Sequence, residues 1–238
     1  MLANIINSIA VIFGSLIGIF FKRSINTKIT DALVTALALV VAVLGIMGAI
    51  ETADSLGMVI CMALGTLIGE LLDLDGKLTR LAELLKRLVA PKETGESSGN
   101  FTQGFISATL TFCIGSMAIM GAMQAGISGD MSIILSKSVI DCVTAVSFAT
   151  ALGIGVAFSA LPVLVYQGAM TLLASVVAPF LSQPVINEIS AVGSLMMIGI
   201  AINLLNLGKE IKVANMLPAM FLPVIYQPLS QWIGQLIG

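Results

Sequence analysis

Eight apolar stretches, joined by short polar connections, constrain the fold of this chain more than any other feature. A helix that crosses a bilayer needs about 20 mostly apolar residues, and each stretch comes near that length. In chain order they are Asn4–Phe21, Ala32–Ile50, Leu56–Leu72, Phe105–Met123, Ile133–Phe158, Pro162–Leu181, Ile189–Leu207 and Ala214–Ile237. The sequence therefore predicts an all-α, polytopic transmembrane bundle of about eight helices. Seven is the alternative, because no charged residue separates the fifth stretch from the sixth.

The composition fits lipid as the solvent and excludes several classes of protein. Hydrophobic residues make up 58% of the chain and charged residues 10%, against about 45–50% and about 25% in soluble domains. A net charge of −2 offers no basic field for nucleic acid. The chain has no His, and its three Cys lie far apart in apolar segments, so we expect no metal site, cofactor or disulfide. The usual catalytic motifs are also absent, so we do not expect an enzyme.

The Lys and Arg residues predict the orientation in the membrane. The first apolar stretch has no basic residue before it and is followed by Lys22 and Arg23. This pattern predicts a retained helix with its N-terminus outside, rather than a cleaved signal peptide. With that orientation, ten of the eleven basic residues fall in inner connections, as the positive-inside rule requires. The exception is Lys137, which lies inside the fifth stretch.

One long polar segment divides the chain into three parts. Residues 1–75 form a three-helix membrane segment, 76–103 a cytoplasmic segment and 104–238 a five-helix membrane segment, all within one integral membrane domain. Leucines recur at helical spacing in 76–89 with charges opposite, which predicts an amphipathic helix on the inner membrane surface. The alternative is a solvated helix that joins two bundles. Pro91 to Asn100 is rich in Gly, Ser and Glu and is expected to be flexible.

Repeated glycines indicate an inverted repeat. Gly14 and Gly168 are 154 residues apart, and so are Gly45 and Gly199. That offset places helices 1–3 over helices 6–8 in opposite orientations, an arrangement of many secondary transporters. Chance matches in Gly-rich apolar sequence are the alternative. Glycines four residues apart also favour close helix packing, which would permit a homodimer; they occur at positions 14 and 18 and at 65 and 69.

Lys137 and Asp141 are the leading candidate site. They are four residues apart and therefore share one face of a helix. A charge at the centre of a membrane helix costs about 2.5–3.5 kcal/mol, so such a pair is by default a functional-site hypothesis. Lys137 is only about one turn inside its helix and can extend towards the interface. Asp141 lies deeper, and both the functional and the structural interpretation stay open.

Other polar residues extend this candidate ion- or substrate-binding site. Thr144 continues the face of the pair, and Ser138 lies beside it. Five further candidates are Gln167, Asn203, Ser116, Gln124 and Glu70. The alternative for the first four is a hydrogen bond to a neighbouring helix, and for Glu70 it is contact with solvent at the membrane interface.

Gly153, Gly155 and Pro162 interrupt the longest apolar region. They indicate either a broken helix that exposes backbone groups to a ligand or the end of a helical hairpin on the inner face.

Several motifs together resemble one family. They are Phe101-Thr-Gln-Gly-Phe, Phe112-Cys-Ile-Gly-Ser-Met-Ala-Ile-Met-Gly, Lys137-Ser-Val-Ile-Asp141, Leu152-Gly-Ile-Gly-Val-Ala-Phe-Ser-Ala and Tyr166-Gln-Gly. Across essentially the whole chain they resemble the YqgA/YdfK-type family, domain of unknown function 554. The resemblance implies a multi-pass protein of the bacterial inner membrane. It implies no activity and assigns no binding residues.

Two functions of different classes remain. The first is a small-solute or ion secondary transporter, or a channel-like protein, with a buried polar site at Lys137 and Asp141. Its partners would be the lipid bilayer and an unknown solute or ion. The second is a non-transporting membrane partner or sensor that acts through residues 76–103.

Overall fold

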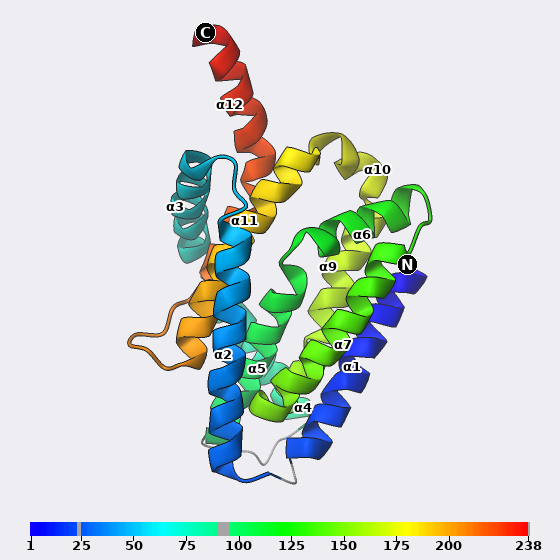
Figure 1. The fold of residues 1–238 in the computed structure, drawn as a ribbon, viewed down its shortest axis with the longest axis vertical. Helices are drawn as coiled ribbons and strands as arrows, with labels where there is room; N and C mark the ends of the chain where they lie inside the picture. The colour runs from blue at the N-terminus through cyan, green and yellow to red at the C-terminus, as the bar shows by residue number, and fades with distance from the viewer. Residues whose placement is uncertain (23–24, 90–95, 238) are drawn as a thin grey trace.

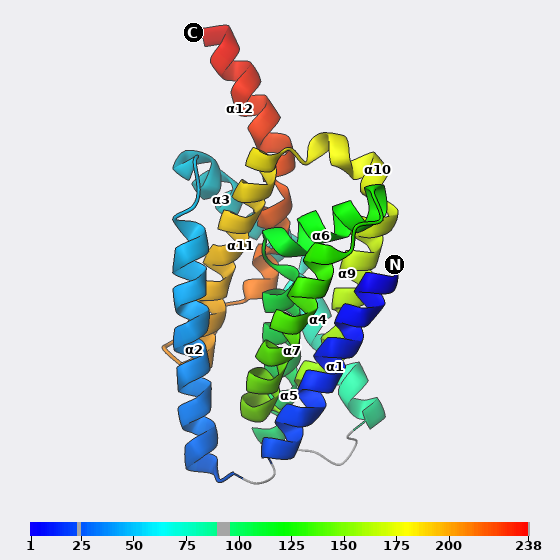
Figure 2. The same cartoon turned by 45° about the vertical axis from the view of Figure 1, so that its right-hand side comes forward.

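The computed structural model describes residues 1–22, 25–89 and 96–237, and every regular element in them is a helix. Figures 1 and 2 show the elements packed side by side, except for α12, which projects beyond the others. They are α1 Leu2–Lys22, α2 Thr27–Ala49, α3 Ser55–Leu72, α4 Leu74–Val89, α5 Glu96–Cys113, α6 Ser116–Ile127, α7 Ser132–Leu152, α8 Gly155–Phe158, α9 Ala160–Leu172, α10 Ala174–Val177, η1 Ala178–Phe180, α11 Gln183–Leu204, η2 Val213–Phe221 and α12 Pro223–Ile237.

Fewer helices are long and apolar enough to cross a membrane than the eight predicted. Among the described residues there are six, or seven if the bent α5–α6 pair forms one span. The last predicted stretch, Ala214–Ile237, is divided between η2 and α12 and supplies none of them. Pro218 lies inside η2 and Pro228 inside α12, and proline removes a backbone donor that a continuous helix needs. The chain is thus an all-helical, multi-pass membrane protein, and its described residues contain fewer membrane-spanning helices than the eight predicted.

The fourth predicted stretch, Phe105–Met123, is not one straight helix. Its two halves, α5 and α6, meet at an angle of 61°. The break falls at Gly115, whose φ of +114° is strained for residues with a side chain. The following α6 begins without a side-chain cap. This broken helix in the middle of the bundle was not predicted from the sequence.

The break at Gly153 is the end of a hairpin, as the second interpretation of that region held. Helix α7 ends at Leu152, Gly153 takes a φ of +87°, and the chain turns through α8 into α9. Lys22 at the end of α1 donates from Nζ to the Ala151 carbonyl at 3.1 Å. A cation at a helix C-terminus also suits the helix dipole.

Glycines lie at three close helix contacts, which confirms the packing interpretation. A Cβ on Gly14 of α1 would lie 2.2 Å from the Cys142 carbonyl oxygen of α7. Gly45 packs in the same way on α11, and Gly65 on η2. Without side chains at these positions the backbones approach each other closely. Helices α1 and α7 therefore lie in contact along much of their length (Figure 1).

Helix α4 joins the two parts of the bundle. Its Leu78, Ala82 and Leu85 pack against Phe101 and Phe105 of α5, which favours the joining helix over one that only lies on the membrane. The predicted flexible segment is partly helical, because α5 already begins at Glu96. Residues 90–95 of that segment lie outside the described residues.

Candidate functional site

Lys137 and Asp141 form an ion pair inside the bundle. The Lys137 ammonium contacts Asp141 Oδ2, and each residue is only 5% exposed. The ammonium also lies 5.9 Å from the centre of the Phe112 ring of α5, within the range of a cation–π contact. The lysine therefore turns towards its carboxylate and an aromatic face rather than extending to the interface.

Helix α1 contributes the residue that connects this pair to the rest of the site. The Asn7 amide nitrogen donates to Asp141 Oδ2 and to Gln167 Oε1 of α9, both at 3.1 Å. Asn7 and Gln167 are fully buried. Asn7 thus connects α1 both to the Asp141 carboxylate of α7 and to Gln167 of α9, and the close α1–α7 packing at Gly14 holds these helices together.

A second asparagine on α1 extends the network to α6. The Asn4 amide nitrogen donates to Thr171 Oγ1 at 2.9 Å and to the Gln167 carbonyl at 3.3 Å. Thr171 in turn donates to the Ala122 carbonyl of α6 at 3.1 Å. We call the six connected side chains the polar cluster: Asn4, Asn7, Lys137, Asp141, Gln167 and Thr171.

The polar cluster is not fully satisfied. Asn4 Oδ1, Asn7 Oδ1 and Gln167 Nε2 are buried and have no hydrogen-bond partner in the described part of the chain. A buried polar atom left unpaired costs about 1–3 kcal/mol, and native proteins nearly always satisfy such atoms with protein or water. The cluster therefore has the capacity to bind one more polar molecule.

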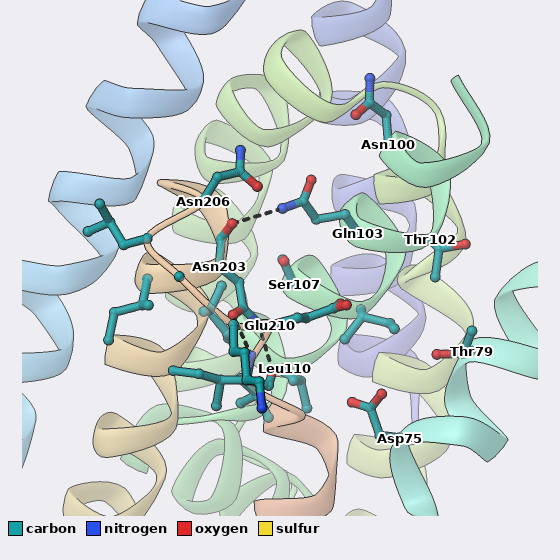
Figure 3. Close-up of a pocket in the computed structure, with 18 of the residues that line it drawn as sticks. Asp75, Thr79, Asn100, Thr102, Gln103, Ser107, Leu110, Asn203, Asn206 and Glu210 are labelled. Atoms are coloured by element: carbon teal, nitrogen blue, oxygen red, sulfur yellow. Dashed lines mark hydrogen bonds between the residues drawn. The ribbon is translucent and has the colours of Figure 1, made fainter. Parts of the chain in front are cut away.

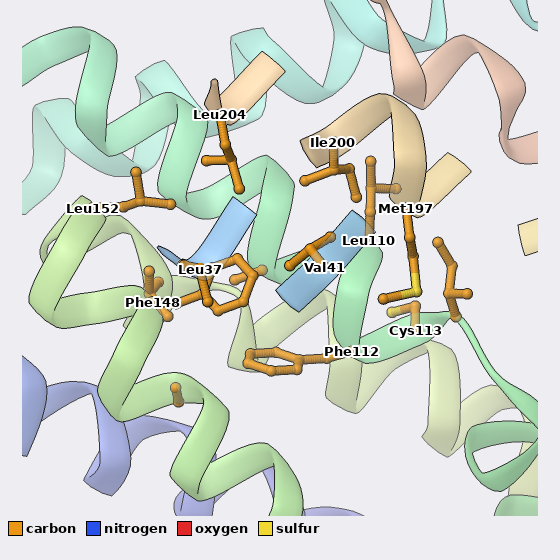
Figure 4. Close-up of a cluster of buried hydrophobic side chains, with 14 of the residues drawn as sticks. Leu37, Val41, Leu110, Phe112, Cys113, Phe148, Leu152, Met197, Ile200 and Leu204 are labelled. Carbon is orange, nitrogen blue, oxygen red and sulfur yellow. The ribbon is translucent and has the colours of Figure 1, made fainter. Parts of the chain in front are cut away.

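Apolar side chains close the polar cluster on two sides. Ala3, Ala122 and Ile134 pack over one side. On the other side, α2, α5, α7 and α11 contribute a larger group that Figure 4 shows around the Phe112 ring. We call this group the apolar layer: Leu37, Val41, Leu110, Phe112, Cys113, Phe148, Met197 and Ile200. Because Phe112 also lies over Lys137, the apolar layer borders the ion pair directly.

A polar cavity of about 860 Å³ lies beyond the apolar layer, between α4, α5, α11 and the 205–212 connection. Leu110 and Ile200 line it and also belong to the apolar layer, so the layer forms the apolar end of the cavity. Figure 3 shows the amides, hydroxyls and carboxylates around it. Its charged residues are Asp31, Asp75, Lys209 and Glu210. Partial burial raises the pKa of Asp75 above its ordinary value.

Comparison with known proteins now places the chain in a family. The model of a protein family of unknown function, DUF554, matches residues 2–227. The chain belongs to the DUF554 family. It is 29% identical over 229 residues to "Uncharacterized membrane protein YdfK" of Bacillus subtilis (strain 168), covering 94% of this chain and 95% of that one. It is 29% identical over 225 residues to "Uncharacterized protein YqgA" of Escherichia coli (strain K12), covering 94% of both. No solved structure matches significantly.

Within this DUF554 chain, the predicted site residues separate into different surroundings. Gln167 joins Asp141 and Lys137 in the polar cluster. Ser138 is buried but donates to the Ile134 carbonyl of its own helix at 2.7 Å. Thr144 and, at the start of α6, Ser116 are half-buried.

Three other predicted residues lie away from the polar cluster. Gln124 is exposed on α6 and is not part of the polar cluster. Glu70 is also exposed, and it pairs with Lys212 at 3.4 Å. Asn203 lines the cavity and exchanges two hydrogen bonds with the Ile211 backbone at 2.7 and 2.8 Å, which fixes the 205–212 connection.

The sequence analysis missed Asn4, Asn7 and Thr171. Two asparagines three residues apart in an otherwise apolar first helix were an available signal, because that spacing puts both amides on one helix face. Glu188 of α11 was also missed as a buried acid. It is 3% exposed and accepts hydrogen bonds from Thr52 Oγ1 at 2.6 Å and from the Ala53 amide at 2.8 Å.

Proposed function

We propose that this protein is a secondary transporter or channel-like protein of the bacterial inner membrane that moves an ion, or a small solute coupled to one, through the Lys137–Asp141 site. One observation carries the proposal. A buried, incompletely satisfied polar cluster is separated from a polar cavity only by the apolar layer. Ionisable groups buried in membrane bundles commonly mark ion or substrate pathways. No catalysis is part of the proposal.

The positive-inside pattern supports an inward-facing cavity. With the N-terminus outside, the connection 205–212, which carries Lys209 and Lys212, lies at the inner face. The cavity opens beside this connection. Asn7 and Asp141 lie in the N-terminal halves of α1 and α7, which places the polar cluster in the outer half of the membrane. The apolar layer then acts as the inner gate of an occluded site.

Helix contacts support the proposed inverted repeat of helices 1–3 and 6–8. Gly65 of α3 packs directly on Ala219 of η2, 154 residues later. Gly45 of α2 packs on Ile198 of α11, close to Gly199. A two-fold axis in the membrane plane brings equivalent residues together only where it passes between them. The first contact falls at the 154-residue offset and the second one residue from it, as an inverted repeat would produce, and many transporters bind substrate near this interface.

The charge of the cavity favours a cation as the ion. Three carboxylates, from Asp31, Asp75 and Glu210, line the cavity with one ammonium, from Lys209. Such a cavity concentrates cations and repels anions. Asp141 is then the acceptor for the ion, and Lys137 balances its charge in the resting state. The alternative, with Lys137 binding an anion, has less support from this cavity.

Ion flux into proteoliposomes tests the proposal. Purified protein is reconstituted in vesicles that contain either a pH-sensitive or a sodium-sensitive dye, and an inside-negative potential is applied. We expect protein-dependent flux of one of these cations and its loss in Asp141→Asn. The matched control is Glu188→Gln, a buried acid on α11 outside the polar cluster, which should keep the flux. If neither cation moves, or if Asp141→Asn transports normally, the proposal is wrong.

A second function has one observation in its favour. Leu81, Leu84 and Leu88 of α4 are exposed beside the face that packs on α5, and this apolar strip suits the membrane surface or a partner helix. A sensor acting through residues 76–103 would depend on this face. Leu84→Ser with Leu88→Ser should then abolish signalling, whereas a transporter should keep its flux.

A further inference from the structure

The amide orientations in the polar cluster follow from its hydrogen bonds. Asn7 bonds two acceptors, Asp141 Oδ2 and Gln167 Oε1, through one atom, so that atom must be its NH₂ nitrogen. Its oxygen is then the unpaired atom. Since Gln167 accepts through Oε1, its unpaired atom is the nitrogen. Thr171 donates its only hydroxyl proton to the Ala122 carbonyl, so it must accept from Asn4. The Asn4 atom next to Thr171 is therefore the NH₂ nitrogen, and its unpaired atom is the oxygen.

The three unpaired atoms therefore form a defined set of two acceptors and one donor. Asn4 Oδ1 and Asn7 Oδ1 are the acceptors, and Gln167 Nε2 is the donor. Asn4 and Asn7 lie one turn apart on α1, and both amides bond Gln167, one to its backbone and one to its side chain. All three residues are fully buried. In number and kind these groups match a water molecule, which donates twice and accepts, and buried waters typically make about three hydrogen bonds.

The same set is a poor match for a metal cation. Alkali and alkaline-earth cations need a shell of several oxygen ligands. Here one of the three unpaired atoms is the Gln167 nitrogen, which is a donor, and Asp141 Oδ2 already accepts from Asn7 and Lys137. The described residues also contain no group of three or more His, Cys, Asp and Glu that could hold a metal. A proton, by contrast, needs only one acceptor oxygen.

We propose that Asn4, Asn7 and Gln167 bind one buried water molecule, and that the ion accepted at Asp141 is the proton rather than a metal cation. This inference rests on the proposed function, because it names the ion of the same site. In the step itself, the Asp141 carboxylate binds a proton and becomes a neutral carboxylic acid. The Lys137 ammonium keeps its charge and loses its counter-ion. The ion pair within α7 is then lost, and the Asn7 amide of α1 faces a neutral carboxyl group, so the hydrogen bond that links α1 to α7 weakens as the proton arrives.

Two measurements test the two halves of this proposal. A structure of the protein in lipid nanodiscs, at a resolution that shows waters, should contain one density at hydrogen-bond distance from Asn4 Oδ1, Asn7 Oδ1 and Gln167 Nε2. An empty site, or a density with the short contacts of a metal ion, would overturn the water assignment. In proteoliposomes with the pH and sodium dyes, a pH gradient should drive protein-dependent proton movement and a sodium gradient none.

Variants connect the water site to the proton flux. Gln167→Met keeps the side-chain volume but removes the Nε2 donor, together with the Oε1 acceptor of Asn7, and we expect it to reduce proton flux about tenfold. The matched control is Thr109→Val, which removes another unpaired, buried polar atom outside the polar cluster and should leave the flux unchanged. Equal flux in Gln167→Met and wild type would contradict the role of the water. Sodium flux that depends on Asp141 would overturn the proton assignment but leave the proposed function standing, whereas no flux of either ion would overturn the proposed function itself.

Discussion

Removing one charge of the Lys137–Asp141 pair should destabilise the protein more than removing both. Lys137→Met leaves the Asp141 carboxylate buried, with only the Asn7 amide to stabilise it. Breaking a buried ion pair by deleting one partner costs about 3–5 kcal/mol. For a chain of this size, that lowers the unfolding temperature by roughly 6–20 °C.

The double variant Lys137→Met/Asp141→Leu tests the reasoning. Replacing both charges with apolar side chains removes the uncompensated charge. What remains is one unpaired N–H of Asn7, because its other N–H still bonds Gln167. That loss is worth about 1–3 kcal/mol. The double variant should therefore be more stable than Lys137→Met alone.

Thermal unfolding in detergent measures these differences. A thiol-reactive fluorescent dye reports the exposure of Cys61 and Cys113, which are buried in the folded protein. Lys209→Met is the matched control, because Lys209 is exposed at the cavity and its loss should change stability by less than about 0.5 kcal/mol. If the effects of the two single substitutions simply add in the double variant, Lys137 and Asp141 do not act as a pair and the reasoning fails.

Three further predictions use the same unfolding assay. Gly65→Leu should destabilise by about 3 kcal/mol, because a Cβ there would lie 2.2 Å from Ala219 Cα; an unchanged unfolding temperature would contradict the tight α3–η2 contact. Asp75→Asn should stabilise at pH 8, because burial raises the pKa of Asp75 and its charged form opposes folding above that pKa. The gain should vanish below about pH 3, where Asp75 is protonated in both folded and unfolded chains, and a gain that persists there would have another cause. Glu188→Ala should cost about 2–3 kcal/mol by removing the acceptor of Thr52 Oγ1, and Glu188→Gln should cost less, because one amide oxygen still accepts; equal costs would show that hydrogen bonding is not the reason.

The sequence and the structure agree where a property is local. The apolar stretches near α1, α2, α3 and α11 were found because length and hydropathy are properties of consecutive residues. Prediction from the sequence failed where the structural effect of a glycine within an apolar stretch had to be decided. A glycine at 115 and glycines at 153 and 155 look alike in sequence. One marks a 61° bend inside the bundle and the others a hairpin end.

In the candidate site, too, local features were predictable from the sequence and features that depend on neighbouring helices were not. Lys137 and Asp141 stood out because charges are rare in apolar segments, and their i, i+4 spacing was enough to predict that they pair. Gln124 and Gln167 are chemically identical and both lie in apolar stretches. Only Gln167 faces the polar cluster, because the direction of a side chain in a membrane helix depends on which neighbours that helix packs against.

The sequence by itself determined that the chain is an all-helical membrane protein with one unusual pair of charges. Those facts depend on the cost of exposing polar groups to lipid, which each segment meets alone. Only the tertiary structure decided what surrounds the pair. The glycine contacts that join α1 to α7 bring Asn7 within hydrogen-bond distance of both Asp141 and Gln167, each more than 130 residues away from it in the chain. Such pairing depends on the shapes of two helix surfaces together, and no single segment of the sequence contains that information.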